Sequence, residues 1–266
     1  MLLRRLKSIY KKNFSVSYDS YEYSDFWKGR DYEDQSDKIA VSKLLSMING
    51  SHEKIIDIGA GMGRMALLYE KKWNEFVLFD FSKHQINEAR ENIEREDIFD
   101  SKKAQYAVGA IESIPFPNAS FDTALCVRTF HYVFYAGIAI GEISRILKPE
   151  GYFILEIPNK LHFKNRALSI LRRRRDASTI FSRDPINIAV KDNVNFLNHN
   201  PKTIIEILKS NNFEIVKVLS ASNFRFPLIK RIFPIELIVK FEKITQEILA
   251  SFYFGPSIYF LAKKSK

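Results

Sequence analysis

The stretch Ile55-Ile56-Asp57-Ile58-Gly59-Ala60-Gly61-Met62-Gly63-Arg64 decides the fold of this chain. Its first residues predict a short apolar strand, and the three alternating glycines predict a tight turn directly after it. Glycine lets the backbone turn sharply and approach a ligand without a Cβ clash. Amide groups exposed at such a turn favour a negative group, such as an amino-acid carboxylate. A strand-to-helix turn without a ligand has the same pattern. Whether this loop binds a ligand is therefore decided by other features of the sequence.

Strand and helix signals alternate on both sides of this loop, which predicts parallel strands joined by crossover helices. We therefore expect an α/β fold with a doubly wound, mostly parallel sheet and flanking helices. The predicted strands span residues 54–58, 76–79, 104–108, 123–127, 152–157, 213–220 and 257–262. The predicted helices span residues 34–48, 64–72, 82–95, 138–147 and 202–211, and a mostly helical stretch runs up to residue 250.

Two further features indicate a nucleoside site. Phe79-Asp80 closes the next predicted strand, 21 positions after Gly59, a spacing at which a carboxylate binds the ribose hydroxyls of an adenosine. The loop over residues 109–122 then joins the third predicted strand to the fourth. A dinucleotide such as NAD is disfavoured, because the third glycine of its G-x-G-x-x-G fingerprint would fall on Arg64, where close helix packing needs a small residue.

The region from about Ile55 to Ile157 resembles the core of the class I, Rossmann-like methyltransferases that use S-adenosylmethionine (SAM), especially the group of quinone-biosynthesis and small-molecule enzymes. Four ordered pieces carry the resemblance: residues 57–63, Asp80, Ile114-Pro115-Phe116-Pro117 with Phe121-Asp122, and Leu147-Lys148-Pro149-Glu150-Gly151. The resemblance implies a seven-stranded sheet whose last strand is antiparallel. It also implies methyl transfer from SAM, with S-adenosyl-L-homocysteine as product, and leaves the methyl acceptor open.

The resemblance implies cofactor contacts as well. The glycine loop should hold the methionine part of SAM, Asp80 the ribose and Phe81 the adenine. One position departs from the family: an acidic residue that accepts a hydrogen bond from the adenine amino group is usual at the place of Ala110. Alanine cannot accept this bond, so we expect weakened SAM binding. The predicted cofactor-binding residues of the core are Asp57, Gly59, Ala60, Gly61, Gly63, Asp80, Phe81, Ala110, Ile111, Glu112 and Val127.

The segment before the first long helix is expected to act as a lid. In similar enzymes this region folds over the cofactor, so Arg30 and Tyr32 should reach the methionine carboxylate; a surface arm packed by its aromatic residues is the alternative. We divide the chain into four parts: an N-terminal arm and lid helix (1–50), a SAM-binding core (51–158), an inserted basic cap after strand five (159–200), and the C-terminal part of the sheet with a helical insertion (201–266).

Two histidines are candidate general bases. Ligands of doubly wound sheets bind at the carboxyl ends of the strands, and His131 follows the fourth predicted strand. His199 is the second candidate, with a helix cap or a packed loop as its alternative. Methyl transfer requires neither histidine as a base. Alignment of the acceptor with the methyl group alone supplies about 7–11 kcal/mol of the activation barrier. No histidine pair has metal-ligand spacing, so we expect no metal, and Cys126, the only cysteine, should be a small core residue.

The net charge of +10 favours an anionic partner. The run Arg172-Arg173-Arg174-Arg175 is either solvated or in contact with phosphate. Apolar and basic residues also mix in segments 1–12 and 224–234, which favours a membrane surface or an amphipathic substrate over RNA. We therefore expect a methyltransferase that acts on a small or lipid-like acceptor, with an anionic membrane surface as a partner.

Two other functions remain open at this point: an RNA methyltransferase that uses the basic insert, and a SAM-binding regulatory protein without transfer activity. The start of the chain lacks the long apolar core of a signal peptide. The longest uncharged stretch, residues 248–262, is shorter than the roughly 20 residues of a membrane span. One cysteine fits a reducing compartment. We expect a cytoplasmic protein, peripheral at the membrane, and leave its oligomeric state open.

Overall fold

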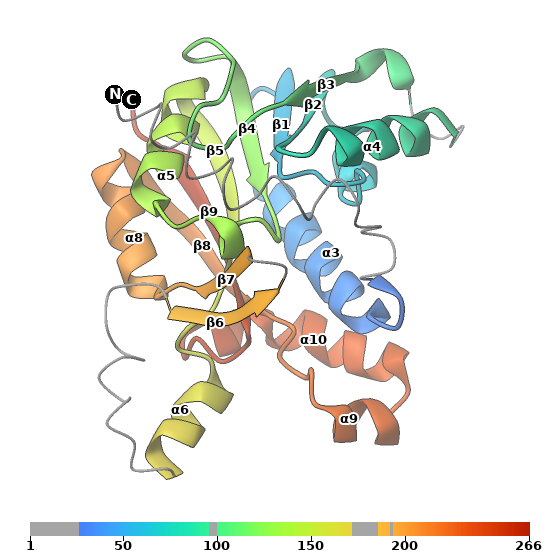
Figure 1. Ribbon diagram of the computed structural model, residues 1–266, viewed down its shortest axis with the longest axis vertical. Coiled ribbons are helices and arrows are strands. Elements are labelled where there is room, and N and C mark those ends of the chain that lie inside the picture. The colour runs from blue at the N-terminus through green and yellow to red at the C-terminus, as the bar shows by residue number, and fades with distance from the viewer. Residues whose placement is uncertain (1–26, 96–99, 172–185, 192–193) are drawn as a thin grey trace.

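The computed structural model describes residues 27–95, 100–171, 186–191 and 194–266. Seven strands of the described residues form one sheet in the order β3-β2-β1-β4-β5-β9-β8 (Figure 1). Strand β9 runs antiparallel to its neighbours β5 and β8, and the other six strands are parallel. The predicted sheet, including its antiparallel last strand, is therefore confirmed. The strands are β1 (Lys54–Ile58), β2 (Glu75–Asp80), β3 (Ala104–Val108), β4 (Phe121–Cys126), β5 (Leu147–Pro158), β8 (Phe213–Ala221) and β9 (Ser257–Lys264).

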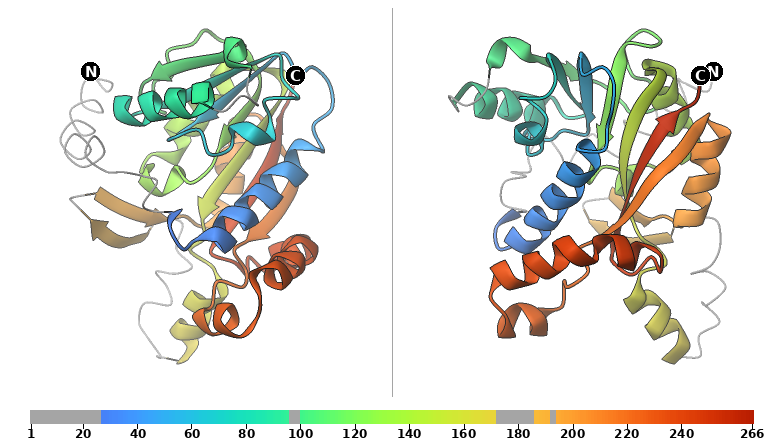
Figure 2. Two further views of the ribbon diagram at one scale, coloured as in Figure 1. Left: turned by 90° about the vertical axis from the view of Figure 1, so that its right-hand side faces the viewer. Right: turned by 180° about the vertical axis from the view of Figure 1, so that it is seen from behind.

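Helices cover both faces of the sheet (Figures 1 and 2). One face packs against α3 (Asp31–Leu45), the short 3-10 helix η1 (Ala66–Leu68) and α4 (Lys83–Arg95), and the other against α5 (Ala136–Ile146) and α8 (Pro201–Ser210). The central strands are apolar on both sides because both of their faces are buried. Cys126 lies fully buried on β4, as predicted. The Ser82 hydroxyl accepts a hydrogen bond from the amide of Gln85 at 3.3 Å and so caps the first turn of α4.

The helix predicted over residues 64–72 is wrong. A run of turns replaces it, with only the three residues of η1 in 3-10 geometry. Gly61 and Gly63 have φ angles of 54° and 83°, so the chain leaves the loop in the left-handed region, which regular helices do not use. The apolar spacing that suggests a helix instead buries Tyr69 and Trp73 against the sheet.

The insert after β5 starts and ends at the same place. Residues 159 and 199 form an isolated parallel bridge, and the amide of Lys160 donates to the His199 carbonyl at 2.9 Å. Between these ends lie α6 (Phe163–Leu171) and the antiparallel hairpin of β6 (Ile186–Lys191) and β7 (Val194–Asn198), which is a second, two-stranded sheet. The hairpin adjoins η3 (Phe130–Tyr132), the 3-10 turn that follows β4. The predicted arginine run 172–175 lies outside the described residues, as does the segment 1–12.

Two helices separate β8 from β9. They are α9 (Pro227–Ile232) and α10 (Ile235–Ala250), and α10 packs against α3. Together with α6 they form the lower end of the molecule (Figures 1 and 2). Within the described residues, no helix is long and apolar enough to cross a membrane. The proposed division of the chain into four parts stays a prediction.

Candidate functional site

The glycine loop after β1 lies against the neighbouring strands through its backbone. The amides of Gly59 and Ala60 both donate to the carbonyl of Phe79, at 2.7 and 3.2 Å, which holds the loop to the end of β2. Gly59 has a φ of 72°, and a Cβ built there would lie 1.9 Å from the Thr129 hydroxyl oxygen. Position 59 therefore requires glycine twice over, for its backbone conformation and for the close approach of the loop that follows β4.

Asp80 lies beside this loop at the carboxyl end of β2. One of its carboxylate oxygens accepts from the Gly61 amide and the other from the Ser82 amide, both at 2.9 Å. Burial raises the pKa of Asp80, and bonds from the backbone amides of Ser82, Gly61 and Phe81 oppose that rise. The amides fix the direction of the carboxylate while each oxygen keeps a lone pair for a further donor.

A hollow opens between the glycine loop, the end of β2 and the exit of β4. Its volume is about 750 Å³ with the open mouth included, within the usual range of ligand pockets. Apolar and backbone groups dominate its wall, and Asp80 and Arg128 contribute carboxylate and guanidinium groups. The lining residues are Ile58, Gly59, Gly61, Phe79, Asp80, Phe81, Ser82, Gln85, Gly109, Ala110, Ile111, Arg128, Thr129, Tyr132 and Val133.

Asp57 lies underneath the loop and outside this lining. Its carboxylate accepts a hydrogen bond from the Tyr69 hydroxyl at 3.0 Å, and the residue is buried. Burial raises the pKa of Asp57 to about 7, although the Tyr69 bond and the Arg64 charge oppose the rise and the nearby Asp80 adds to it. The predicted direct cofactor contact of Asp57 is therefore not what the structure shows: the residue supports the loop from below.

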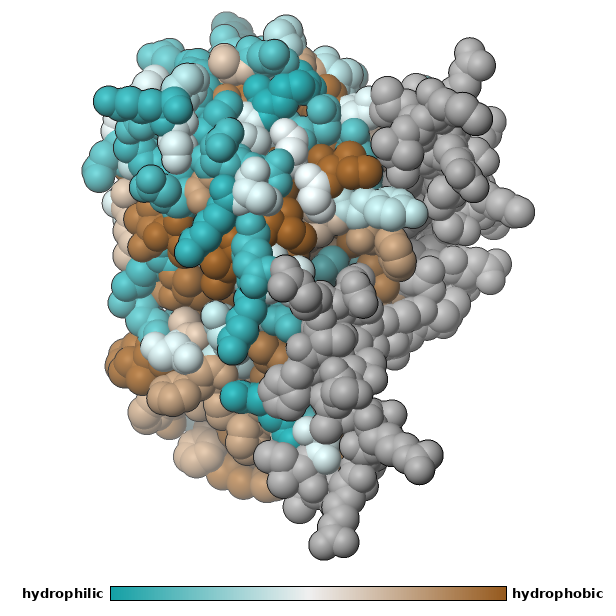
Figure 3. All heavy atoms as spheres, turned by 90° about the vertical axis from the view of Figure 1, so that its left-hand side faces the viewer, coloured by the Kyte–Doolittle hydropathy of each residue, from teal (hydrophilic) through white to brown (hydrophobic). Residues whose placement is uncertain are grey.

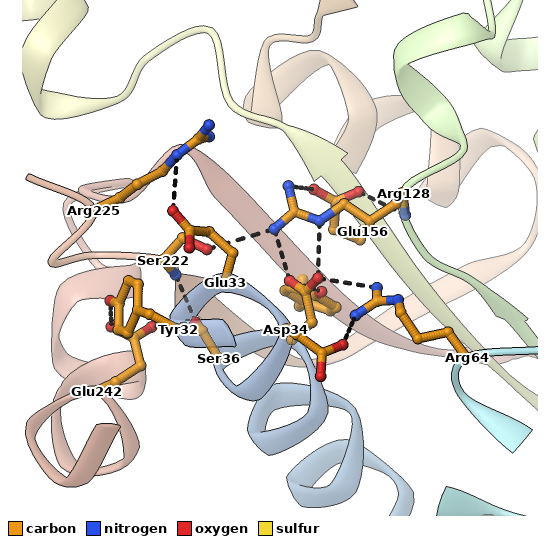
Figure 4. Close-up of polar contacts among 12 residues, drawn as sticks. Tyr32, Glu33, Asp34, Ser36, Arg64, Arg128, Glu156, Ser222, Arg225 and Glu242 are labelled. Atoms are coloured by element: carbon orange, nitrogen blue, oxygen red, sulfur yellow. Dashed lines mark hydrogen bonds and ion pairs between the residues drawn. The ribbon is translucent and has the colours of Figure 1, made fainter. Parts of the chain in front are cut away.

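A buried ionic cluster joins α3 to the loop and to the exit of β4 (Figure 4). Asp37 on α3 pairs with Arg128 through bonds of 2.8 and 2.9 Å, and with Arg64 at 3.1 Å. It also accepts from the Tyr259 hydroxyl at 2.7 Å. Burial raises the pKa of Asp37, but the two guanidinium charges outweigh burial, so the pKa lies below its ordinary value. Arg64, the residue incompatible with an NAD loop, thus has a structural role of its own.

Arg128 is the member of this cluster that reaches the hollow. Its φ of 58° is in the left-handed region, which is uncommon for a residue with a side chain. Its amide donates to Glu156 at 3.0 Å, and its guanidinium lies 3.9 Å from the other oxygen of that carboxylate. Glu156 is fully buried on β5, and burial raises its pKa. These contacts from α3 and β5 hold Arg128 in a strained conformation at the pocket wall.

The predicted lid residues lie elsewhere. The Tyr32 hydroxyl donates to Glu242 on α10 at 2.6 Å and accepts from the Phe224 amide at 2.8 Å, so it faces the interior between α3 and α10 (Figure 4). The predicted cofactor contact of Tyr32 is wrong for that reason. Arg30 precedes the first turn of α3 and is absent from the lining. Its contact with the methionine carboxylate stays a prediction.

Neither candidate histidine lines the hollow; both pack against neighbouring residues. The ring of His131 stacks on Phe196 with 5.4 Å between centroids, and burial, with the Arg128 charge, lowers its pKa to about 3. The Nε2 atom of His199 lies 2.8 Å from the Phe130 carbonyl oxygen, and burial lowers the pKa of this buried residue as well. The lowered pKa makes each ring a weaker base near neutral pH, and the general-base roles stay predictions.

Six of the predicted cofactor residues line one hollow in the structure, and the other seven are not among its lining residues. Those in the lining are Gly59, Gly61, Asp80, Phe81, Ala110 and Ile111. Those outside it are Asp57, Ala60, Gly63, Glu112, Val127, Arg30 and Tyr32. The sequence reasoning missed Ser82, Gln85 and Val133. A sequence signal for Ser82 and Gln85 exists, since Ser82 caps the helix that begins at Lys83, just after Asp80, and Gln85 lies in its first turn. In the described residues, no group of three or more His, Cys, Asp or Glu side chains is placed to hold a metal ion.

Comparison with known proteins agrees with this geometry. Residues 56–155, which run from β1 into β5, match the family of methyltransferase domains. The segment is therefore similar to methyltransferase domains, and the strand order of the sheet is that of the class I, Rossmann-like fold. The matched range contains the glycine loop, Asp80 and the exit of β4, and therefore most of the lining of the hollow.

Three relatives show how far the similarity extends. The uncharacterized methyltransferase YcgJ of Bacillus subtilis is 30% identical over 105 residues, 40% of each chain. The ubiquinone/menaquinone biosynthesis C-methyltransferase UbiE of Rickettsia massiliae is 28% identical over 118 residues, 42% of this chain and 47% of the relative. The chain thus spans less than half the length of these curated relatives. Among solved structures, an S-adenosylmethionine-dependent methyltransferase from Clostridium acetobutylicum matches all of both chains with a TM-score of 0.58 at 14% identity, which establishes the shared fold.

Proposed function

We propose that this protein is a SAM-dependent methyltransferase that transfers a methyl group to a small or lipid-like acceptor. The observation that carries the proposal is the position of Asp80: its carboxylate shares one hollow with the backbone of Gly59 and Gly61. A carboxylate at the end of β2 beside a glycine loop is the arrangement that binds the ribose of an adenosine. The methyltransferase-domain match over residues 56–155 supports SAM as the nucleoside.

The residues of the hollow suit the three parts of SAM. Gly59 and Gly61 line the hollow without side chains, so a ligand can approach the backbone of the loop. The lone pairs of Asp80 can accept from the two ribose hydroxyls. The Phe81 ring, 40% exposed, and the apolar Ala110 and Ile111 offer a surface for adenine. Ala110 offers no acceptor for the adenine amino group, so we expect the backbone to provide the polar contacts there.

The reaction requires positioning more than acid–base chemistry. When bound, SAM supplies a methyl group on a positively charged sulfonium. The acceptor would bond to this methyl carbon as the carbon–sulfur bond breaks, which would leave S-adenosyl-L-homocysteine and release the acceptor's proton to solvent. Thr129, Tyr132 and Val133 at the exit of β4 would orient the acceptor, since the carboxyl ends of the strands bind the ligand in this fold. Alignment of this kind supplies about 7–11 kcal/mol of a barrier.

The wall on the acceptor side supports an acceptor with an apolar body. At the exit of β4, Val133 contributes hydrocarbon to the hollow, and Tyr132 contributes an aromatic ring with a polar end. Hydrophobic pockets with a few polar groups bind the apolar part of a ligand and orient its reactive end.

Titration calorimetry with SAM, NAD and S-adenosyl-L-homocysteine tests the proposed cofactor. We expect binding of SAM and of the homocysteine product, and Asp80→Ala should weaken SAM by roughly 100-fold, because two hydrogen bonds to a charged group are lost. Asp100→Ala is the matched control: Asp100 is exposed, and within the described residues its carboxylate accepts only from the nearby amide of Lys102. Tighter binding of NAD than of SAM, or an unchanged SAM affinity in Asp80→Ala, contradicts the proposal.

Transfer of a labelled methyl group from SAM in a cell extract tests the acceptor class. We expect the label in the lipid or small-molecule fraction, and no transfer by Asp80→Ala. Label that enters only RNA or only protein would overturn the acceptor part of the proposal and leave the cofactor part intact.

A further inference from the structure

Helix α10 exposes its hydrophobic side and buries a partly polar one. Residues 238, 242, 246 and 250 recur every four positions and are buried, and two of them are Glu242 and Gln246. The opposite side carries Leu237, Phe241, Ile244 and Ile248, of which the last three are 53%, 68% and 63% exposed. A surface helix of a globular protein normally buries its apolar stripe. The orientation of α10 is therefore the reverse of the usual one.

The buried polar side fixes this orientation. Glu242 accepts from the hydroxyls of Tyr32 and Ser36, at 2.6 and 2.8 Å, and from the backbone and side-chain nitrogens of Asn223, both at 3.1 Å. Gln246 donates to the Ser36 carbonyl at 3.0 Å. Rotation of α10 to bury the apolar side would expose this network and break its bonds, since a buried carboxylate is tolerated only with such partners. The outward apolar stripe is thus a fixed feature of the fold.

The exposed apolar residues continue beyond α10. We call the α9–α10 face the set Phe226, Leu228, Ile232, Phe233, Leu237, Phe241, Ile244, Ile248 and Phe252, which are nine of the sixteen large hydrophobic residues that the described part of the chain exposes. Phe163 of α6 adjoins this face, because it stacks on Phe254, and Arg166 donates to the Phe252 carbonyl. Hydrophobic residues gather at the lower end of the molecule in Figure 3. A concentration of this kind marks an interaction surface.

Positive charge borders the α9–α10 face. Arg231, Lys240 and Lys243 are exposed on the same two helices, and no ion pair of theirs occurs within the described residues. The acidic Glu247 is paired with Lys43 and Lys217, which leaves Glu236 as the exposed carboxylate of α10 against three exposed cations. An apolar stripe with flanking lysine and arginine suits the boundary between acyl chains and anionic headgroups, where the long side chains reach the phosphates. A second copy of the chain would place these cations against their own equivalents.

We propose that the α9–α10 face binds the surface of an anionic phospholipid bilayer. Helices α9, α10 and α6 lie together at one end of the molecule (Figures 1 and 2). Strand β4, whose exit lines the hollow, runs toward this same end (Figure 1). Binding at the α9–α10 face therefore brings the hollow near the lipid surface. The inference is independent of methyl transfer, because it concerns only where the protein attaches.

Sedimentation with vesicles tests this surface in the full chain. Phosphatidylcholine vesicles with and without phosphatidylglycerol are used, at two salt concentrations. We expect binding only to the anionic vesicles, and a loss of at least about tenfold in vesicle affinity for Ile244→Gln/Ile248→Gln, since each change removes an inserted hydrophobic side chain. Val216→Gln is the matched control, because Val216 is a similarly exposed hydrophobic residue on β8. Unfolding curves establish that each variant folds.

Charge reversal tests the basic border separately. Arg231→Glu/Lys240→Glu should lower the affinity for anionic vesicles and remove most of its salt dependence. The proposal is overturned if the wild-type protein does not bind anionic vesicles, if Ile244→Gln/Ile248→Gln binds as tightly as the wild type, or if sedimentation equilibrium shows a dimer that this variant dissociates. Loss of methyl transfer with vesicle binding intact would count against the proposed enzyme activity and leave this surface supported.

Discussion

The guanidinium of Arg128 and the carboxylate of Asp37 meet in a bidentate ion pair, 91 residues apart in the chain, at 2.8 and 2.9 Å. Asp37 is fully buried and lies on α3, whereas Arg128 lies in the wall of the hollow. The pair therefore connects the first long helix to the exit of β4. The loop in which an acceptor would be positioned takes its conformation from a residue outside the matched methyltransferase domain.

Asp37→Asn should lower the free energy of unfolding by about 3–5 kcal/mol, because it removes the fully buried carboxylate charge that Arg64 and Arg128 share. Asp34→Asn is the matched control on the same helix: Asp34 pairs with Lys38 and Arg64 but is partly exposed, so its loss should cost less than about 1 kcal/mol. Urea unfolding measures both. Equal effects of the two substitutions would mean that the buried pair adds no more than the partly exposed one.

Gly59→Ala should destabilise the protein more than Gly63→Ala. Both glycines have positive φ, which costs a side-chain residue about 1–2 kcal/mol. A Cβ at position 63 meets its neighbours at an ordinary 3.7 Å, whereas a Cβ at position 59 collides with Thr129. Thermal unfolding and SAM titration of the two variants check the order. Thr129→Gly should restore part of the loss in Gly59→Ala, and no recovery would argue against the clash.

Asp57→Asn should change how stability depends on pH. The pKa of Asp57 is raised to about 7 from the ordinary 3.8, so between these values the folded protein holds a proton that the unfolded chain has released. The free energy of unfolding of the wild type therefore falls as pH rises through this window. Asparagine cannot ionise, so the stability of the variant relative to the wild type should increase from about pH 4 to 7 and level off above.

Urea unfolding at several pH values measures this difference. Asp100→Asn, an exposed substitution of the same kind, serves as the control. A constant difference between Asp57→Asn and the wild type across the window would show that Asp57 ionises in the folded protein as it does in the unfolded chain.

His131→Phe should keep methyl transfer within about threefold of the wild type, because a general base that mattered would be worth about 10²–10⁴-fold. Phenylalanine preserves the stacking on Phe196 and removes only the ring nitrogens. Labelled methyl incorporation into the acceptor fraction measures the effect, with SAM affinity determined in parallel. A hundredfold lower kcat at unchanged SAM affinity would establish the general-base role of His131.

The sequence predicts the parts of this molecule that depend on local patterns. Apolar runs with regular spacing yield the seven strands, and the glycine loop with Asp80 yields the core of the hollow. The turns after the loop escape prediction, because the buried Tyr69 and Trp73 have a spacing that a helix shares. The backbone at Gly61 and Gly63 decides between the two, and a residue list does not give φ angles.

Long-range partners account for the remaining differences. Tyr32 is aromatic, lies next to Arg30 in the arm and suits a lid, yet its hydroxyl bonds Glu242, 210 positions away. The two histidines have residue types that suit catalysis, but their orientation depends on Phe196 and on the Phe130 carbonyl. The helix of residues 235–250 is periodic, and only the Glu242 network determines which side faces outward.

The contact between Gly59 and Thr129 has a consequence for redesign of the hollow. Because the two residues leave no space between them, the donor loop and the acceptor wall cannot be altered independently at this point. In a library of variants at position 129, the variants would differ mainly in whether they fold. Substitutions at Tyr132 and Val133, which line the same hollow away from this contact, can alter the choice of acceptor while the donor loop keeps its shape.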